Sequence, residues 1–145
     1  MRISLIVVGC ALIAGIWAVR KRAVAEAEVA QLRDAVHRIE ARIAMPPGAA
    51  PLSEYQRYYA WDELEGRRVV LGHFLQDDTP DTSPEAEGVE GLAGSYIWHG
   101  RFLPTIADGG CRMVTVYFDV EADAFILLKR TGGGEAAPAL CNGYA

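Results

Sequence analysis

The sequence predicts an α+β protein: an N-terminal single transmembrane helix, a helical (coiled-coil-like) stalk that continues it, and a small, mainly antiparallel β domain with one short helix. Three observations support this fold class. They are an uncharged run near the N-terminus, a helical segment without Gly or Pro, and a series of short runs rich in β-branched and aromatic residues. The expected parts are an anchor (1–20), a stalk (21–45), a linker (46–53) and a head domain (54–145).

The anchor is predicted from residues 3–19, seventeen residues without a charge. At 1.5 Å per residue, this length spans a hydrocarbon core of about 30 Å when flanking arginines extend to the interface. A cleaved signal peptide or a lipidated Cys10 fits less well, because the run ends in Arg20, Lys21 and Arg22 and few residues precede Cys10. The sequence therefore predicts a single-pass protein of the bacterial inner (plasma) membrane, in contact with membrane lipid.

Charge divides the chain into two parts. Residues 1–51 carry seven Lys/Arg against four Asp/Glu, whereas residues 52–145 carry seven against fifteen. Basic residues beside a span tend to stay in the cytoplasm, so the excess after the uncharged run favours a cytoplasmic head domain, with a periplasmic one as the alternative. An acidic head domain without a basic stripe also argues against nucleic-acid binding.

The stalk is rich in Ala, Glu and Arg, which are good helix formers. Its aliphatic side chains recur at alternating spacings of three and four residues, the pattern of a heptad seam. The seam consists of Val29, Leu32, Val36, Ile39 and Ile43. Its mainly β-branched composition favours a parallel homodimer. The alternative is an amphipathic helix that packs on its own domain, since a core-facing helix shows the same stripe.

The head domain follows a linker in which Pro46 and Pro47 end the helix. Ser53 and Gln56 have the spacing of a capping box, which predicts one short helix up to Gly66. Four strands are predicted at residues 67–75, 95–103, 111–120 and 124–130. The polar turn between the last two predicts a hairpin. Both faces of residues 111–120 are apolar, so we expect both to be covered.

No residue pattern in the chain matches a catalytic or metal-binding motif. The acidic loop from Asp77 has Thr82 and Gly88 where an EF-hand loop needs Gly and Glu. The set His73, His99, Asp108 and Cys111 is a candidate for a thiol–imidazole pair or a zinc site, but its spacings fit neither. We therefore expect no enzyme activity, no cofactor and no metal.

Cys111 and Cys141 are the two cysteines of the head domain. A bond between them would close a loop of about thirty residues and contribute roughly 3–4 kcal/mol to stability. Such a bond requires an oxidising compartment, whereas the basic residues after the uncharged run favour the cytoplasm. The two inferences are incompatible, and the sequence leaves both open.

The predicted function is that of a membrane-anchored structural or interaction protein, which dimerises through its stalk and binds an unidentified protein through its head domain. The alternative is a periplasm-facing binding module with a Cys111–Cys141 disulfide. A thiol- or metal-dependent enzyme is the least favoured alternative.

Overall fold

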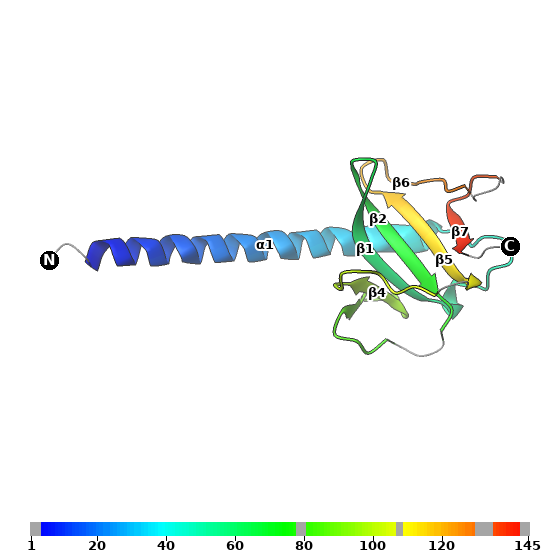
Figure 1. The fold of residues 1–145 in the computed structure, drawn as a ribbon, viewed down its shortest axis with the longest axis horizontal. Coiled ribbons are helices and arrows are strands. Elements are labelled where there is room, and N and C mark those ends of the chain that lie inside the picture. Colours follow the sequence, from blue (N-terminus) through cyan, green and yellow to red (C-terminus); the bar gives the residue numbers. More distant parts are fainter. Residues whose placement is uncertain (1–3, 78–80, 107–108, 130–134, 143–145) are drawn as a thin grey trace. The chain divides into compact units, whose positions relative to one another are not determined.

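The computed structural model describes the backbone of residues 4–77, 81–106, 109–129 and 135–142, and the side chains of these ranges between residues 19 and 141. The chain divides into two compact units, Met1–Gln31 and Leu32–Ala145. The second unit contains every described strand and the last turns of the helix (Figure 1).

The described residues form one α-helix, α1 (Ser4–Arg42), which ends four residues before Pro46. Nowhere in the described part of the chain is a helix both long and apolar enough to cross a membrane. The described side chains of α1 start with Val19, the last residue of the predicted span. The other side chains of the predicted span lie outside the described residues. The predictions of a transmembrane anchor, a single-pass topology and an inner-membrane location are therefore wrong.

The predicted stalk and its coiled coil are also wrong, because the end of α1 packs on the sheet of its own unit. Leu32, Ala35, Val36 and Ile39 are at most 3% exposed. Three of the five predicted seam residues are thus covered within the chain, while Val29 and Ile43 are half-buried. The physical reason is that a stripe with three- and four-residue spacing fits a sheet as well as a second helix.

The described strands form one seven-stranded mixed sheet. They are β1 (Gln56–Leu64), β2 (Arg67–Leu75), β3 (Ala86–Gly88), β4 (Ser95–Trp98), β5 (Gly110–Asp119), β6 (Ala124–Phe125) and β7 (Ala139–Asn142). The strand order is β3-β4-β1-β2-β5-β6, and β7 also pairs with β5. The β1–β4 pair is parallel and the other pairs are antiparallel, so the sheet is mixed.

The short helix predicted before Gly66 is wrong, because these residues form β1 after a single 3-10 turn at Leu52–Glu54. β1 pairs along its whole length with β2, from Gln56–Leu75 to Leu64–Arg67. The turn between them is Glu65-Gly66, with φ values of 53° and 76°. Positive φ at both central residues is the geometry of a tight hairpin, whose twist matches that of the strands.

One sheet face packs against the end of α1, from Leu32 on, which passes behind the strands in Figure 1. Val114, Val116 and Phe118 of β5 share this face and are fully buried. Tyr59 lies opposite Gly72, where an added Cβ would be 2.6 Å from Val116 and 3.0 Å from Tyr59. Glycine at this position therefore lets an aromatic ring occupy the centre of the helix-covered face.

Candidate functional site: a disulfide and an anchored loop

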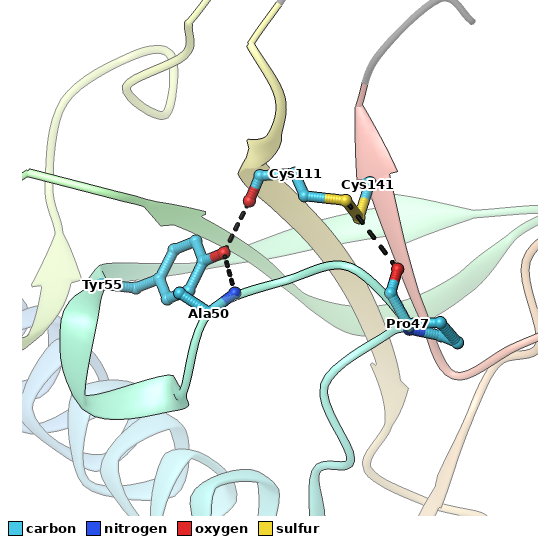
Figure 2. Close-up of a disulfide and its surroundings, with 5 residues drawn as sticks. All are labelled: Pro47, Ala50, Tyr55, Cys111 and Cys141. Atoms are coloured by element: carbon cyan, nitrogen blue, oxygen red, sulfur yellow. Dashed lines mark hydrogen bonds between the residues drawn. A yellow bond between two sulfur atoms is a disulfide. The ribbon is translucent and has the colours of Figure 1, made fainter.

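Cys111 and Cys141 are bonded in the structure and join the start of β5 to β7 across 30 residues of sequence. The chain between α1 and β1 packs over this bond (Figure 2). The Pro47 carbonyl oxygen lies 4.0 Å from Cys111 Sγ, and a Cβ at Gly48 would lie 3.6 Å from that sulfur. The disulfide thus lies where the linker, β5 and β7 meet.

Tyr55 holds the linker in place beside the disulfide. Its hydroxyl donates to the Cys111 carbonyl oxygen at 2.5 Å and accepts the Ala50 N–H at 3.1 Å (Figure 2). The Tyr55 side chain is 1% exposed, so these bonds satisfy a buried hydroxyl. Together these contacts hold the linker against the sheet.

A buried polar network fixes α1 to the strands. Glu40 Oε1 accepts hydrogen bonds from Arg57 Nε at 2.7 Å, Tyr59 Oη at 2.8 Å and Ser95 Oγ at 2.6 Å. The Arg57 and Glu40 side chains are only 6% and 7% exposed. Burial and the nearby Glu40 carboxylate raise the pKa of Tyr59, so its hydroxyl stays protonated as a donor. The network joins α1, β1 and β4.

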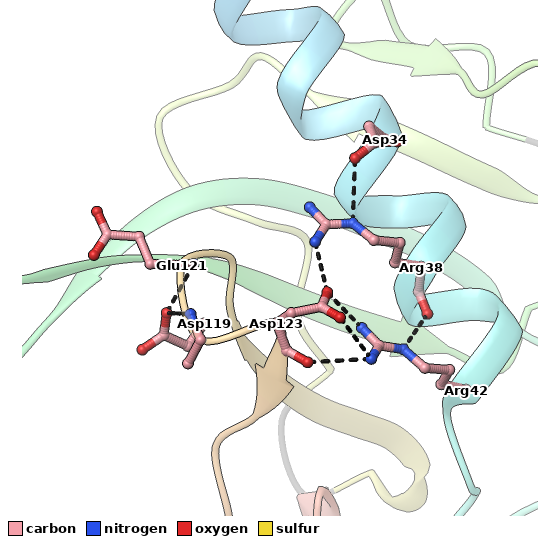
Figure 3. Close-up of polar contacts among 7 residues, drawn as sticks. Asp34, Arg38, Arg42, Asp119, Glu121 and Asp123 are labelled. Carbon is pink, nitrogen blue, oxygen red and sulfur yellow. Dashed lines mark hydrogen bonds and ion pairs between the residues drawn. The ribbon is translucent and has the colours of Figure 1, made fainter.

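A second, exposed ion-pair cluster joins α1 to the β5–β6 hairpin (Figure 3). Arg38 and Arg42 bond the Asp123 carboxylate at 2.6 Å and 2.9 Å. These hydrogen bonds hold the pKa of Asp123 below its ordinary value. The Asp119 carboxylate accepts the N–H groups of Glu121 and Ala122 and so shapes the turn that presents Asp123.

The sheet face opposite α1 carries an aromatic cluster. Tyr58 stacks on Tyr96 with ring centroids 5.4 Å apart and meets Trp98 edge-on at 5.7 Å. Buried Leu75 and Met113 complete the cluster on the neighbouring strands. The chain that follows β4, residues 99–106, covers it with Leu103 and Ile106. We call this segment the anchored loop.

Polar contacts fix the C-terminal end of the anchored loop, and packing fixes its start. The Ile106 N–H donates to Met113 Sδ at 3.3 Å, and His73 Nδ1 donates to the Pro104 carbonyl oxygen at 3.0 Å. Burial lowers the pKa of His73, which favours the neutral ring. A Cβ at Gly100 would lie 2.5 Å from Trp98 Nε1, so the indole packs directly against the loop backbone.

Phe102 projects from the anchored loop and is 75% exposed. The Arg101 guanidinium lies 5.1 Å from its ring centroid, a cation–π contact that extends the surface of the ring. The contacts on both sides of Phe102, at Gly100 and at Pro104 and Ile106, hold the backbone that carries this exposed ring.

The sequence-predicted candidates for chemistry have other partners in the structure. Cys111 is part of the disulfide and carries no thiol. His73 bonds Pro104, while His99 Nε2 bonds Glu87 at 2.8 Å, and Asp108 lies outside the described residues. Among the described residues there is no group of three or more His, Cys, Asp or Glu side chains arranged to hold a metal ion.

Sequence reasoning missed Phe102, Glu40 and Arg57. Arg57 falls within the predicted short helix, and Glu40 occupies a helix position where a charged residue is ordinarily solvated. The sequence feature that could have singled out Phe102 is its place in a loop directly after Gly100 and Arg101. Loops that bind proteins are often rich in Gly, Arg and aromatic residues.

No family model matches the sequence, and comparisons with curated proteins and with solved structures find nothing significantly similar to it.

Proposed function

We propose that the second unit is a protein-binding module that inserts Phe102 into an apolar pocket of a partner protein. The observation that carries this proposal is the contrast within the anchored loop: Leu103 and Ile106 pack inward, while Phe102 is 75% exposed. An isolated exposed phenylalanine is ordinary, but one on a loop held by His73, Trp98 and Met113 is displayed in a fixed position. Aromatic and Arg side chains are also the residues that most often dominate binding energies.

The charge of the domain supports a basic partner. Residues 52–145 carry fifteen acidic against seven basic side chains, so long-range attraction favours a partner of opposite charge. The Cys111–Cys141 bond supports an oxidising compartment as the place of binding, because intracellular thiols ordinarily stay reduced. The proposal thus keeps the protein-binding role predicted from the sequence and adds the Cys111–Cys141 disulfide of the alternative prediction.

Photo-crosslinking in cells that express the full chain tests this function. A photoreactive amino acid at position 102 is compared with the same residue at position 127, where Leu127 is 61% exposed and outside the anchored loop. We expect an adduct with another, basic protein from position 102 and none from position 127.

The variant Gly100→Ala tests whether the fixed position of the anchored loop matters for the adduct from position 102. The added methyl group collides with Trp98 and displaces the loop, so the adduct from position 102 should weaken by about tenfold. Equal adducts from both positions, an adduct insensitive to Gly100→Ala, or an adduct only with a second copy of the chain would contradict the proposal.

A further inference from the structure

The strand β7 is held by its ladder with β5, by the Leu128–Ala137 bridge just before it, and by the Cys111–Cys141 bond. It is four residues long and pairs only with β5, so it forms an edge of the described sheet. Among its described side chains, Ala139 is 1% exposed, while Leu140 and Cys141 are half-buried. One buried methyl group is a small contribution to a sheet, so the crosslink contributes a large share of what keeps β7 in place.

The strand that β7 covers is central to the fold. β5 pairs with β2 from Met113 to Asp119 on its other side, and its Val114 and Val116 are fully buried against α1. Loss of β7 would therefore leave β5 in place and free its outer edge between Gly110 and Val116. A free edge presents unpaired N–H and C=O groups, which form a template for another extended chain.

We propose that the disulfide is a redox-controlled lock on this edge: its reduction releases β7, and β5 then pairs with an extended segment of another protein. Cys111 and Cys141 are half-buried rather than enclosed, and the reductant is a dithiol of the Cys-X-X-Cys class, which approaches the bond from the side that the linker leaves open. A thiolate of the dithiol attacks Cys141 Sγ, the S–S bond breaks, and Cys111 leaves as a thiolate that takes up a proton. The second thiol of the reductant then displaces Cys141, so the protein gains two electrons and two protons while the dithiol becomes a disulfide.

The pairing of β7 itself specifies the ligand. The incoming segment runs antiparallel to β5, as β7 does, and occupies the positions opposite Val114, Thr115 and Val116. The residue opposite Val116 is small, because Ala139 fills that position at 1% exposure. This is recognition by strand addition, in which main-chain hydrogen bonds supply affinity and one small side-chain position supplies specificity.

Hydrogen exchange on the full chain, with and without dithiothreitol, tests the release. We expect the amides of β7 to lose protection on the order of 100-fold after reduction, which is the equilibrium effect of a crosslink across a loop of this length. The amides of β1 and β2 should keep their protection. Unchanged protection of β7 would overturn the proposal, because the disulfide would then not hold β7 in place. Loss of protection throughout the sheet would also overturn it, because the disulfide would then stabilise the whole domain and not β7 alone.

A fluorescent peptide of residues 136–142 carrying Cys141→Ser tests the vacated edge. We expect at least tenfold tighter binding to the reduced chain and to the Cys111→Ser/Cys141→Ser chain than to the oxidised chain. A peptide that also carries Ala139→Glu is the matched control and should not bind, because its carboxylate would face the buried position.

Adding Ala139→Glu to the Cys-free chain removes competition from its own β7, since the new carboxylate cannot occupy that position either. This triple variant should bind the peptide most tightly. If it is folded by circular dichroism and does not bind, or if oxidised and reduced chains bind equally, the β5 edge is not a docking site and the proposal fails.

Discussion

The two faces of the sheet are closed in different ways. The end of α1 covers one face with a buried apolar stripe and the buried Glu40–Arg57 pair. The anchored loop covers the other face with Leu103, Ile106 and single hydrogen bonds from the strands next to it. Stability is thus concentrated on the helix-covered face, and the loop-covered face is free to carry an exposed aromatic residue.

The largest effect is expected for Glu40→Ala. This change leaves the Arg57 guanidinium buried without its charge partner and should lower the free energy of unfolding by about 3–5 kcal/mol. Urea unfolding followed by circular dichroism measures it. The double change Glu40→Leu/Arg57→Met removes both charges and should recover most of the lost stability. If Glu40→Ala is as stable as the parent, the network does not hold α1 to the strands.

Ile39→Ala tests the apolar stripe under α1. Ile39 is 0% exposed, so the cavity should lower the free energy of unfolding by about 2–5 kcal/mol. Because the contact lies within one chain, the loss should be independent of protein concentration. Val24→Ala is the control, since Val24 is 57% exposed and should change stability by less than about 0.5 kcal/mol. A loss that grows on dilution would instead point to contact between chains.

A pH dependence is expected from the loop-covered face. Burial keeps the pKa of folded His73 below its ordinary value of 6.5. As the pH falls below about 6.5, the unfolded chain therefore binds a proton that the folded chain does not, and stability decreases. Urea unfolding at about pH 7.5 and about pH 5.5 measures this loss, which His73→Gln should reduce while keeping a donor for Pro104. If the parent and His73→Gln lose the same stability between these pH values, His73 is not the cause of the pH dependence.

The smallest effect is expected for Asp123→Ala at the exposed rim of the helix-covered face. The Arg38 and Arg42 pairs with Asp123 are solvated, so their loss should destabilise the protein only slightly. The difference from the parent should vanish at about 1 M salt, where exposed charges are screened. A loss comparable with that of Glu40→Ala, or one unaffected by salt, would contradict the distinction between buried and rim contacts.

Local patterns were sufficient to predict parts of the sheet. β2 coincides with the predicted strand 67–75, and the hairpin between Phe118 and Phe125 lies where the polar turn indicated. In both cases the signal is contained in about ten consecutive residues, namely β-branched and aromatic side chains bounded by turn residues. Such segments carry enough local information for their own conformation to be inferred.

The errors arise where a partner distant in the sequence decides the outcome. Ser53 and Gln56 have helix-capping spacing, but the residues that follow pair with β2 and, in parallel, with β4. The stripe on α1 fits a coiled coil equally well, and only the sheet formed by later residues determines its partner. Tertiary pairing overrode the local preference in both segments.

The candidate site was largely beyond sequence reasoning for the same reason. Cys111 and Cys141 were identified as candidates for a bond, since two cysteines allow only one pairing within the head domain. The exposure of Phe102, in contrast, depends on how His73, Trp98 and Met113 hold the anchored loop, and these residues come from three strands. The Gly-Arg-Phe composition of this segment draws attention to Phe102, but it does not specify that Phe102 faces outward while Leu103 faces inward.

The Arg38–Asp123 contact joins residues 85 positions apart. At a synthesis rate of about 5–20 residues per second, the ribosome needs roughly 4–17 s after making Arg38 before Asp123 exists. Until β5 is made, the apolar stripe of α1 lacks the strand that supplies Val114, Val116 and Phe118 to the helix-covered face. The helix-covered face can therefore close only in the last part of the synthesis of the chain.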